Sequence, residues 1–174
     1  MTQAKTYTLK VQFDADQTGN SPLWDLVDNQ GNNALQKKGP DTGNLLLAPG
    51  SQLSLVVTAT AEKGTQTTGA TLGNVALITL PRGDTLEPSL VASSPYSVLQ
   101  LPGSSFTVTR PQAQGWQNVF TLNSPLPVVG SGSGGNQGTW ELALIVNVTL
   151  QGQGPNARPR VLRFDPEVKV GDQR

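Results

Sequence analysis

The chain contains no cysteine and no histidine among its 174 residues. Without cysteine there is no disulfide, no thiolate metal ligand and no cysteine nucleophile. Without histidine the chain lacks the usual general base near neutral pH and the commonest metal ligand. These absences exclude Ser-His-Asp triads, Cys-His dyads and ordinary zinc sites, so we expect the protein not to be an enzyme.

The chain also has little charge. Lysine plus arginine number 12, aspartate plus glutamate number 12, and charged residues make up 14% of the chain, against about 25% in an average domain. A neutral surface attracts a polyanion weakly, so we expect no nucleic-acid partner. It also gives copies of the chain little mutual repulsion, which favours a homo-oligomer.

Long apolar runs are missing as well. The most apolar segment, LALIVNVTL at 142–150, is far below the roughly 20 residues that span a bilayer. The first residues, MTQAKTYTLK, lack the apolar core of a signal peptide. We therefore expect no membrane association and a cytoplasmic location.

Apolar and polar residues alternate along much of the chain, which is the period of a half-buried β-strand. The longest alternating segments are 7–13, 53–59, 140–150 and 162–170. Shorter apolar segments lie at 22–27, 44–48, 74–80, 96–101, 105–110 and 117–122. No stretch of ten residues has a helical period. The pattern predicts nine to eleven strands and essentially no helix.

Turn-forming residues separate these segments, with 19 glycines and 13 prolines in the chain. Many short strands with such turns are typical of a sandwich or barrel, and the alternation favours antiparallel sheets with one wet face. We expect one domain over residues 1–174, an all-β antiparallel two-sheet β-sandwich of Ig-like or jelly-roll-like type. The segment 128–138, rich in glycine and serine, has the composition of a flexible loop.

The segment FDADQTGNSPLWD at 13–25 has the oxygen spacing of a calcium loop. Loop positions 1, 3, 5, 6 and 12 fall on Asp14, Asp16, Thr18, Gly19 and Asp25. A strand pattern precedes it, however, and Pro22 and Trp24 stand where a helix would begin. We interpret the segment as strand, turn and strand, and expect no cofactor. A calcium site formed by Asp14, Asp16 and Asp25 is the alternative.

Other polar and aromatic motifs have simple structural explanations. Arg82-Gly83-Asp84, the tripeptide of integrin ligands, follows a strand segment as an ordinary turn. The arginines at 158, 160 and 163 are interpreted as charges that protect a sheet edge from further strand addition. Trp24, Trp116 and Trp140 are expected in the core, and carbohydrate stacking on them is the alternative.

Asp165-Pro166 interrupts the last alternating segment. Proline removes a donor from the hydrogen-bond ladder and is confined to edges and bulges. The step therefore predicts a bulge at this point or a strand that switches between the two sheets.

The two ends of the chain carry distinctive strand patterns. TLKVQFDAD at 8–16 is a strand that runs into an acidic turn. VLRFDPEVKV at 161–170 contains a pattern of aromatic, Asp, Pro, aliphatic and Val, formed by Phe164, Asp165, Pro166, Val168 and Val170. Together the two ends resemble the opening and closing strands of the AidA/PixA inclusion-body protein family of bacteria. LWDLVDNQGN at 23–32 and APGSQLSLVV at 48–57 are similar to further strands of the family.

The resemblance implies a cytoplasmic β-sandwich that accumulates or self-assembles, and no catalytic residues come with it. We therefore expect a non-enzymatic protein that self-associates, with a storage, stress or accessory role. The alternative is a binding module, lectin-like or calcium-dependent, that uses loops at one end of the sandwich.

Overall fold

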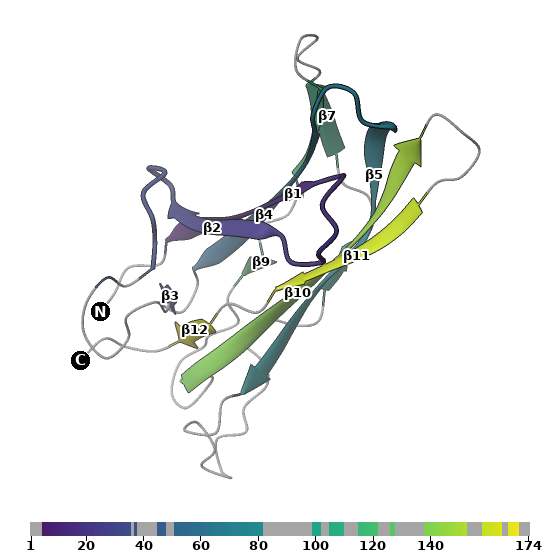
Figure 1. The fold of residues 1–174 in the computed structure, drawn as a ribbon. Coiled ribbons are helices and arrows are strands. Elements are labelled where there is room, and N and C mark those ends of the chain that lie inside the picture. The colour runs from purple at the N-terminus through teal and green to yellow at the C-terminus, as the bar shows by residue number, and fades with distance from the viewer. Residues whose placement is uncertain are drawn as a thin grey trace.

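The described part of the chain is all-β. The computed structural model describes residues 5–35, 37, 45–47, 51–81, 99–101, 105–109, 115–121, 126–127, 138–152, 158–164 and 167–170. Within these residues the chain forms strands in two sheets and no helix, as the alternation predicts (Figure 1). It follows that these residues include no helix with the length and apolar character that a membrane crossing needs.

The first sheet is built around the N-terminal strand. Its order is β2-β1-β4-β8-β7, with β9 paired to one end of β4. The strands are β1 (Thr6–Asp14), β2 (Leu23–Asp28), β4 (Gln52–Ala61), β7 (Ser105–Thr109), β8 (Trp116–Thr121) and β9 (Leu126–Pro127).

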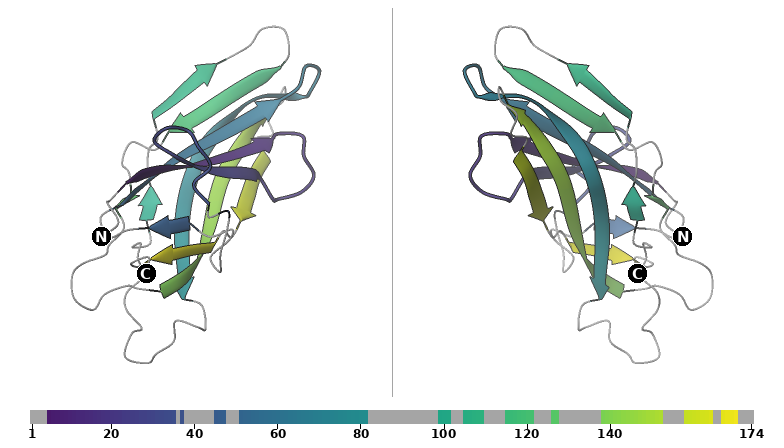
Figure 2. Two further views of the ribbon diagram at one scale, coloured as in Figure 1. Left: turned by 90° about the vertical axis from the view of Figure 1, so that its left-hand side faces the viewer. Right: turned by 90° about the vertical axis from the view of Figure 1, so that its right-hand side faces the viewer.

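The second sheet is built around the longest strands. Its order is β3-β12-β10-β5-β6, with β11 also paired to β10. The strands are β3 (Leu45–Leu47), β5 (Thr67–Pro81), β6 (Leu99–Leu101), β10 (Gly138–Gly152), β11 (Arg158–Phe164) and β12 (Glu167–Val170). In both views of Figure 2, β5 and β10 run side by side.

Two strand pairs are parallel, so the expectation of purely antiparallel sheets is wrong. β1 pairs with β4 in parallel over nine residues, from Thr6↔Gln52 to Asp14↔Thr60. β12 pairs with β3 in parallel as well. Alternation reports which face of a strand is buried, and both kinds of ladder can bury one face. The pattern therefore carries no information on strand direction.

The two sheets share one hydrophobic core. Alternate residues of β1, β4, β5, β8, β10 and β11 meet in a single cluster of buried side chains. The largest fully buried side chains are Phe13, Phe120, Leu53, Leu144, Leu162, Val11, Val57, Val75 and Val146. They come from both sheets, so burial of the two inner faces is one event and each sheet supports the other.

Hydrogen bonds from β8 to β5 also join the two sheets. The side-chain amide of Asn118 is buried and donates to the Ala70 carbonyl at 2.8 Å. The indole N–H of Trp116 donates to the Thr67 carbonyl at 2.9 Å. Both donors are thereby satisfied at the core boundary, where an unpaired polar group would be costly.

A bulge in β5 explains why its first half escaped the sequence pattern. Val146 pairs with Val75, whereas Val148 pairs with Leu72, so Gly73 and Asn74 together oppose the single residue Asn147. One extra residue reverses the parity of the strand. The inward positions are therefore even before the bulge and odd after it, and no single alternation runs through 67–81.

The expected crossing of the last strand to the other sheet is wrong. Asp165 and Pro166 lie outside the described residues, but β11 and β12 on either side of them both pair with β10. Phe164 pairs with Leu144 and Glu167 pairs with Glu141. The pairs of β11 and those of β12 therefore keep one register along β10.

Two further expectations fall outside the described residues. These are the Arg82-Gly83-Asp84 tripeptide and residues 128–137 of the loop rich in glycine and serine. Gly138, the last residue assigned to that loop, is the first residue of β10.

We predict that Gly115→Ala destabilises the fold by about 3 kcal/mol, because strain and overlap add. Gly115 has a φ of 115°, and an added Cβ would overlap the carbonyl oxygen of Ala61, which belongs to the backbone and cannot swing away. Chemical denaturation measures the change in the free energy of unfolding.

Gly64→Ala is the matched control for this prediction. Gly64 has a φ of 97° but open space around it, so only the backbone term of about 1 kcal/mol is lost. Equal losses in the two variants would show that the contact with Ala61 contributes nothing.

Candidate functional site

The loop between β1 and β2 is held by its own side chains. The backbone N–H of Asp16 donates to the Asp14 carboxylate at 2.7 Å, and the N–H of Asp14 donates to the side-chain oxygen of Gln17 at 3.0 Å. The amide nitrogen of Gln17 in turn donates to the Gly19 carbonyl at 2.8 Å. Asx turns of this kind account for the acidic residues without a ligand, as the strand-turn-strand interpretation predicts.

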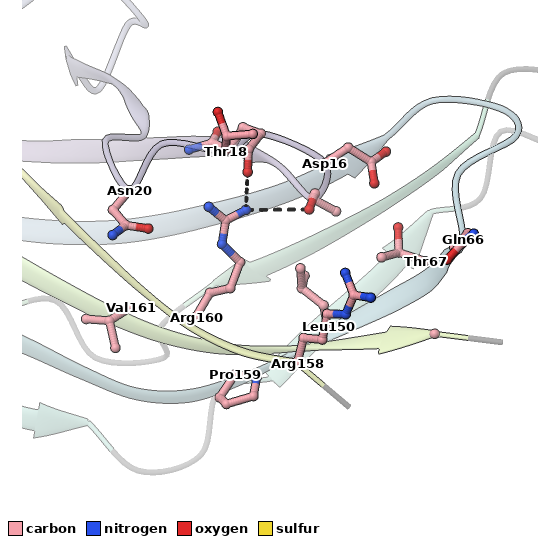
Figure 3. Close-up of a pocket in the computed structure, with 13 residues that line it drawn as sticks. Asp16, Thr18, Asn20, Gln66, Thr67, Leu150, Arg158, Pro159, Arg160 and Val161 are labelled. Carbon is pink, nitrogen blue, oxygen red and sulfur yellow. Dashed lines mark hydrogen bonds between the residues drawn. The ribbon is translucent and has the colours of Figure 1, made fainter. Parts of the chain in front are cut away.

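Arg160 of β11 ties this loop to the second sheet. Its Nη1 donates to the Gln17 carbonyl at 2.6 Å and to the Ala15 carbonyl at 3.5 Å, as Figure 3 shows. Its Nη2 donates to the Gly19 carbonyl at 2.7 Å. Three backbone oxygens of the loop thus converge on one guanidinium, whose fixed planar fork suits such an arrangement.

Arg160 lies on the inward face of its strand. It pairs with Val148 and is followed two residues later by Leu162, and both of these apolar side chains are buried. Paired residues in a ladder share a face, so Arg160 points toward the gap between the sheets. Edge protection, the role expected for the arginine group, therefore does not describe Arg160. The sequence does hold a signal for this position: Arg160 is two residues before Leu162, so the two side chains lie on the same face of the strand.

The outer edge of β11 meets the same loop. The N–H of Arg163 donates to the Asn20 carbonyl at 3.2 Å, so the backbone groups of this residue point away from β10. Backbone direction alternates along a strand, which places the N–H and C=O of Val161 on the same outer edge. Pro159, which has no N–H, falls on this edge as well, where its missing donor costs no ladder bond.

A pocket of about 1090 Å³ opens between the loop, the start of β5 and β11. Figure 3 shows Asp16, Thr18 and Asn20 on the loop side and Arg158 to Val161 on the opposite side. Its lining residues are Ala15, Asp16, Gln17, Thr18, Asn20, Gln66, Thr67, Leu150, Gly152, Arg158, Pro159, Arg160 and Val161. The pocket therefore lies at one end of the two sheets, where the alternative function placed a binding site.

The pocket presents opposite charges on opposite walls. Asp16 is exposed on the loop, and Arg158 is exposed on β11. No ion pair joins these two described side chains. Arg160 also lines the pocket, but three of its five donors are used by the loop carbonyls.

The three candidate calcium ligands are not brought together. Asp14 and Asp16 lie in one turn, but Asp25 pairs with Lys10 of β1. Lys10 is four residues before Asp14, or about 13 Å along the strand. Among the described residues no group of three acidic side chains lies close enough to hold a metal ion. The geometry thus lends no support to this set, and the calcium alternative is left to experiment.

Tyr7 and Asp28 form a second titratable pair, at the far end of the β1–β2 ladder. Hydrogen bonds from the backbone N–H groups of Asn32 and Gln30 hold the pKa of Asp28 below its usual value. Burial raises the pKa of Tyr7, and the negative charge of Asp28 adds to the increase. Both shifts move away from neutral pH, so neither group is tuned for proton transfer.

The tryptophans do not form a sugar platform in the described residues. Trp116 is buried and hydrogen-bonded in the core, as expected. Trp24 is 37% exposed, so its expected core position is wrong, and it lies on edge strand β2. The side chain of Trp140 is outside the described part. Neither Trp24 nor Trp116 lines the pocket beside Arg160.

Comparison with known proteins yields a weak structural likeness. No family model matches the chain, and no curated protein matches it. A solved structure similar to it is that of the PixA inclusion body protein from Burkholderia cenocepacia J2315. The TM-score is 0.39 and the identity 8%, over 98% of each chain. The Burkholderia protein is of the family that both chain ends resemble. At this TM-score and identity, however, the likeness carries no argument.

We predict that Arg160→Met destabilises the protein by about 2 kcal/mol, because three loop carbonyls lose a charged donor. Methionine retains the apolar stem of the side chain, so the change removes chiefly the guanidinium. Chemical denaturation measures the loss, and amide hydrogen exchange of residues 15–20 should accelerate.

Arg163→Met is the matched control, since this arginine has an exposed side chain on the same strand. It should change stability by less than about 0.5 kcal/mol. If the two variants behave alike, the loop does not depend on Arg160.

Proposed function

We propose that the chain is a non-catalytic β-sandwich protein that acts through self-association. The observation that carries this proposal is the outer edge of β11, which bears an exposed apolar side chain. Val161 is 53% exposed on this strand, and Leu23, at the start of β2, is 74% exposed. An apolar side chain exposed beside a sheet edge favours contact with another chain.

The segments that carry the two side chains are joined by one hydrogen bond. The Asn20 carbonyl accepts from the Arg163 amide, Leu23 follows Asn20 by three residues, and Val161 precedes Arg163 by two. We call Leu23, Val161 and the outer edge of β11 between Pro159 and Arg163 the seam. Outward backbone groups of Val161 and an apolar side chain beside them are the features with which one sheet edge pairs with another.

Other observations support this proposal. The zero net charge gives little repulsion between copies. The shared core supports face-to-face packing of the two sheets.

The finer features of the proposal rest on the sequence. The single domain, the sandwich type and the strand count remain predictions, since parts of the chain lie outside the described residues. A storage, stress or accessory role in the cytoplasm rests on the sequence resemblance.

Substitution at the seam tests self-association. We expect the wild-type chain to gain mass with concentration in sedimentation experiments. Leu23→Lys and Val161→Lys should shift it toward the monomer, because a charged lysine on an edge discourages pairing.

Gln52→Lys is the control, because Gln52 is an exposed strand residue at the start of β4, outside the seam. It should associate like the wild type. A wild-type chain that remains monomeric at high concentration would rule out the proposal, and equal association of all variants would place the contact elsewhere.

The pocket beside Arg160 favours a second candidate, a ligand-binding module. Its volume is of the order of known small-molecule sites, about 300–1,000 Å³. Polar groups from the β1–β2 loop and from β11 face the same space, which is how loops at one end of a sandwich form a site.

For calcium itself we predict no binding to the wild-type protein. The loop carbonyls already accept hydrogen bonds from the guanidinium of Arg160, and Asp25 lies away from Asp14 and Asp16. Millimolar calcium should leave the melting temperature unchanged in a thermal melt, with magnesium as the control ion. A rise specific to calcium would show binding to the native state and would restore Asp14, Asp16 and Asp25 as candidate ligands.

A further inference from the structure

We propose that the pocket beside Arg160 binds a small zwitterion, with its carboxylate on Arg158 and its ammonium group on Asp16. This inference rests on the second proposed function, the ligand-binding module. The ligand class is that of free amino acids and short peptides, which carry both charges a few ångströms apart.

The loop wall of the pocket is set before any ligand arrives. Arg160 holds three of its carbonyls, Gln17 bonds within the loop, and Asn20 is tied to Arg163. A wall ordered in advance spares a ligand the entropy of ordering it. Asp16 is therefore presented at a defined place opposite β11.

Among the described lining residues, the charged groups open to a ligand are Arg158 and Asp16. Arg160 keeps its charge but donates to three loop carbonyls, which leaves Arg158 as the described cation with its donors open on this wall. Arg158 pairs with Leu150 and shares the inward parity of Arg160. Asp16 faces it from the loop without forming an ion pair to it (Figure 3). A zwitterion satisfies both groups, whereas a simple anion would meet Asp16 as a like charge.

The remaining lining suits a short polar molecule. Hydroxyls of Thr18 and Thr67 and amides of Asn20 and Gln66 offer both donors and acceptors around the rim. Leu150 supplies apolar surface at the base. No aromatic side chain is among the described lining residues, so a sugar would find no ring to stack on.

Four probes separate the ligand classes in a titration followed by amide NMR shifts. Glycylglycine carries both charges, N-acetylglycine only the negative one, glycinamide only the positive one, and glucose none. We expect glycylglycine to shift the amides of residues 15–20 and those of Arg158, Arg160 and Val161. N-acetylglycine and glycinamide should each bind about fivefold more weakly, which is the contribution of one exposed ion pair, and glucose should shift none.

Variants test the two residues directly. Arg158→Gln should reduce glycylglycine binding to the level of glycinamide, and Asp16→Asn should reduce it to the level of N-acetylglycine. Arg163→Gln is the control, because this exposed arginine on the same strand lies outside the pocket lining, and it should bind like the wild type. Unchanged thermal melts establish that the variants are folded.

The outcomes distinguish the ligand class from the binding function. N-acetylglycine as strong as glycylglycine, or glucose alone shifting these amides, would overturn the zwitterion while a binding pocket stands. No shift with any probe would overturn both the zwitterion and the ligand-binding function. Neither result bears on self-association, which the sedimentation experiment tests separately.

Discussion

Burial of two alternating apolar faces against each other is the constraint on which the other features of this protein depend. The chain has no disulfide, so one core must stabilise both sheets, and side chains from both sheets share it. Polar groups enter that core only with partners: Asn118 and Trp116 donate across from β8 to carbonyls of β5. The same requirement holds at the end of the two sheets, which we call the rim. There the inward positions of β11 pass from the apolar Leu162 to the charged Arg160.

At that rim Arg160 supplies hydrogen-bond donors, which an apolar side chain could not. Its guanidinium donates to three carbonyls of the loop. The loop is thereby fixed across the open end of the sheets, and the space left beside it is the pocket. The calcium-like spacing of FDADQTGNSPLWD thus has a structural explanation, because the cation that the loop contacts belongs to the protein.

The two proposed roles use neighbouring parts of this rim. Val161 lines the pocket and also contributes to the seam through its exposed side chain and outward backbone groups. A copy of the chain paired along β11 would therefore lie beside the pocket. Binding and association are distinct in their chemistry, since one uses the charges of Asp16 and Arg158 and the other uses apolar surface and a strand edge.

The sequence by itself determined where the long strands lie and which faces they bury, because side-chain period and burial are local properties. The odd-numbered residues from Tyr7 to Phe13 and from Leu53 to Ala59 are buried, as predicted. It could not show that these two strands are parallel, that two residues oppose one in β5, or that Arg160 reaches Gly19, 141 residues away. Those features were decided by the tertiary structure, since each depends on which distant segment lies alongside, and the alternation is the same for either partner or direction.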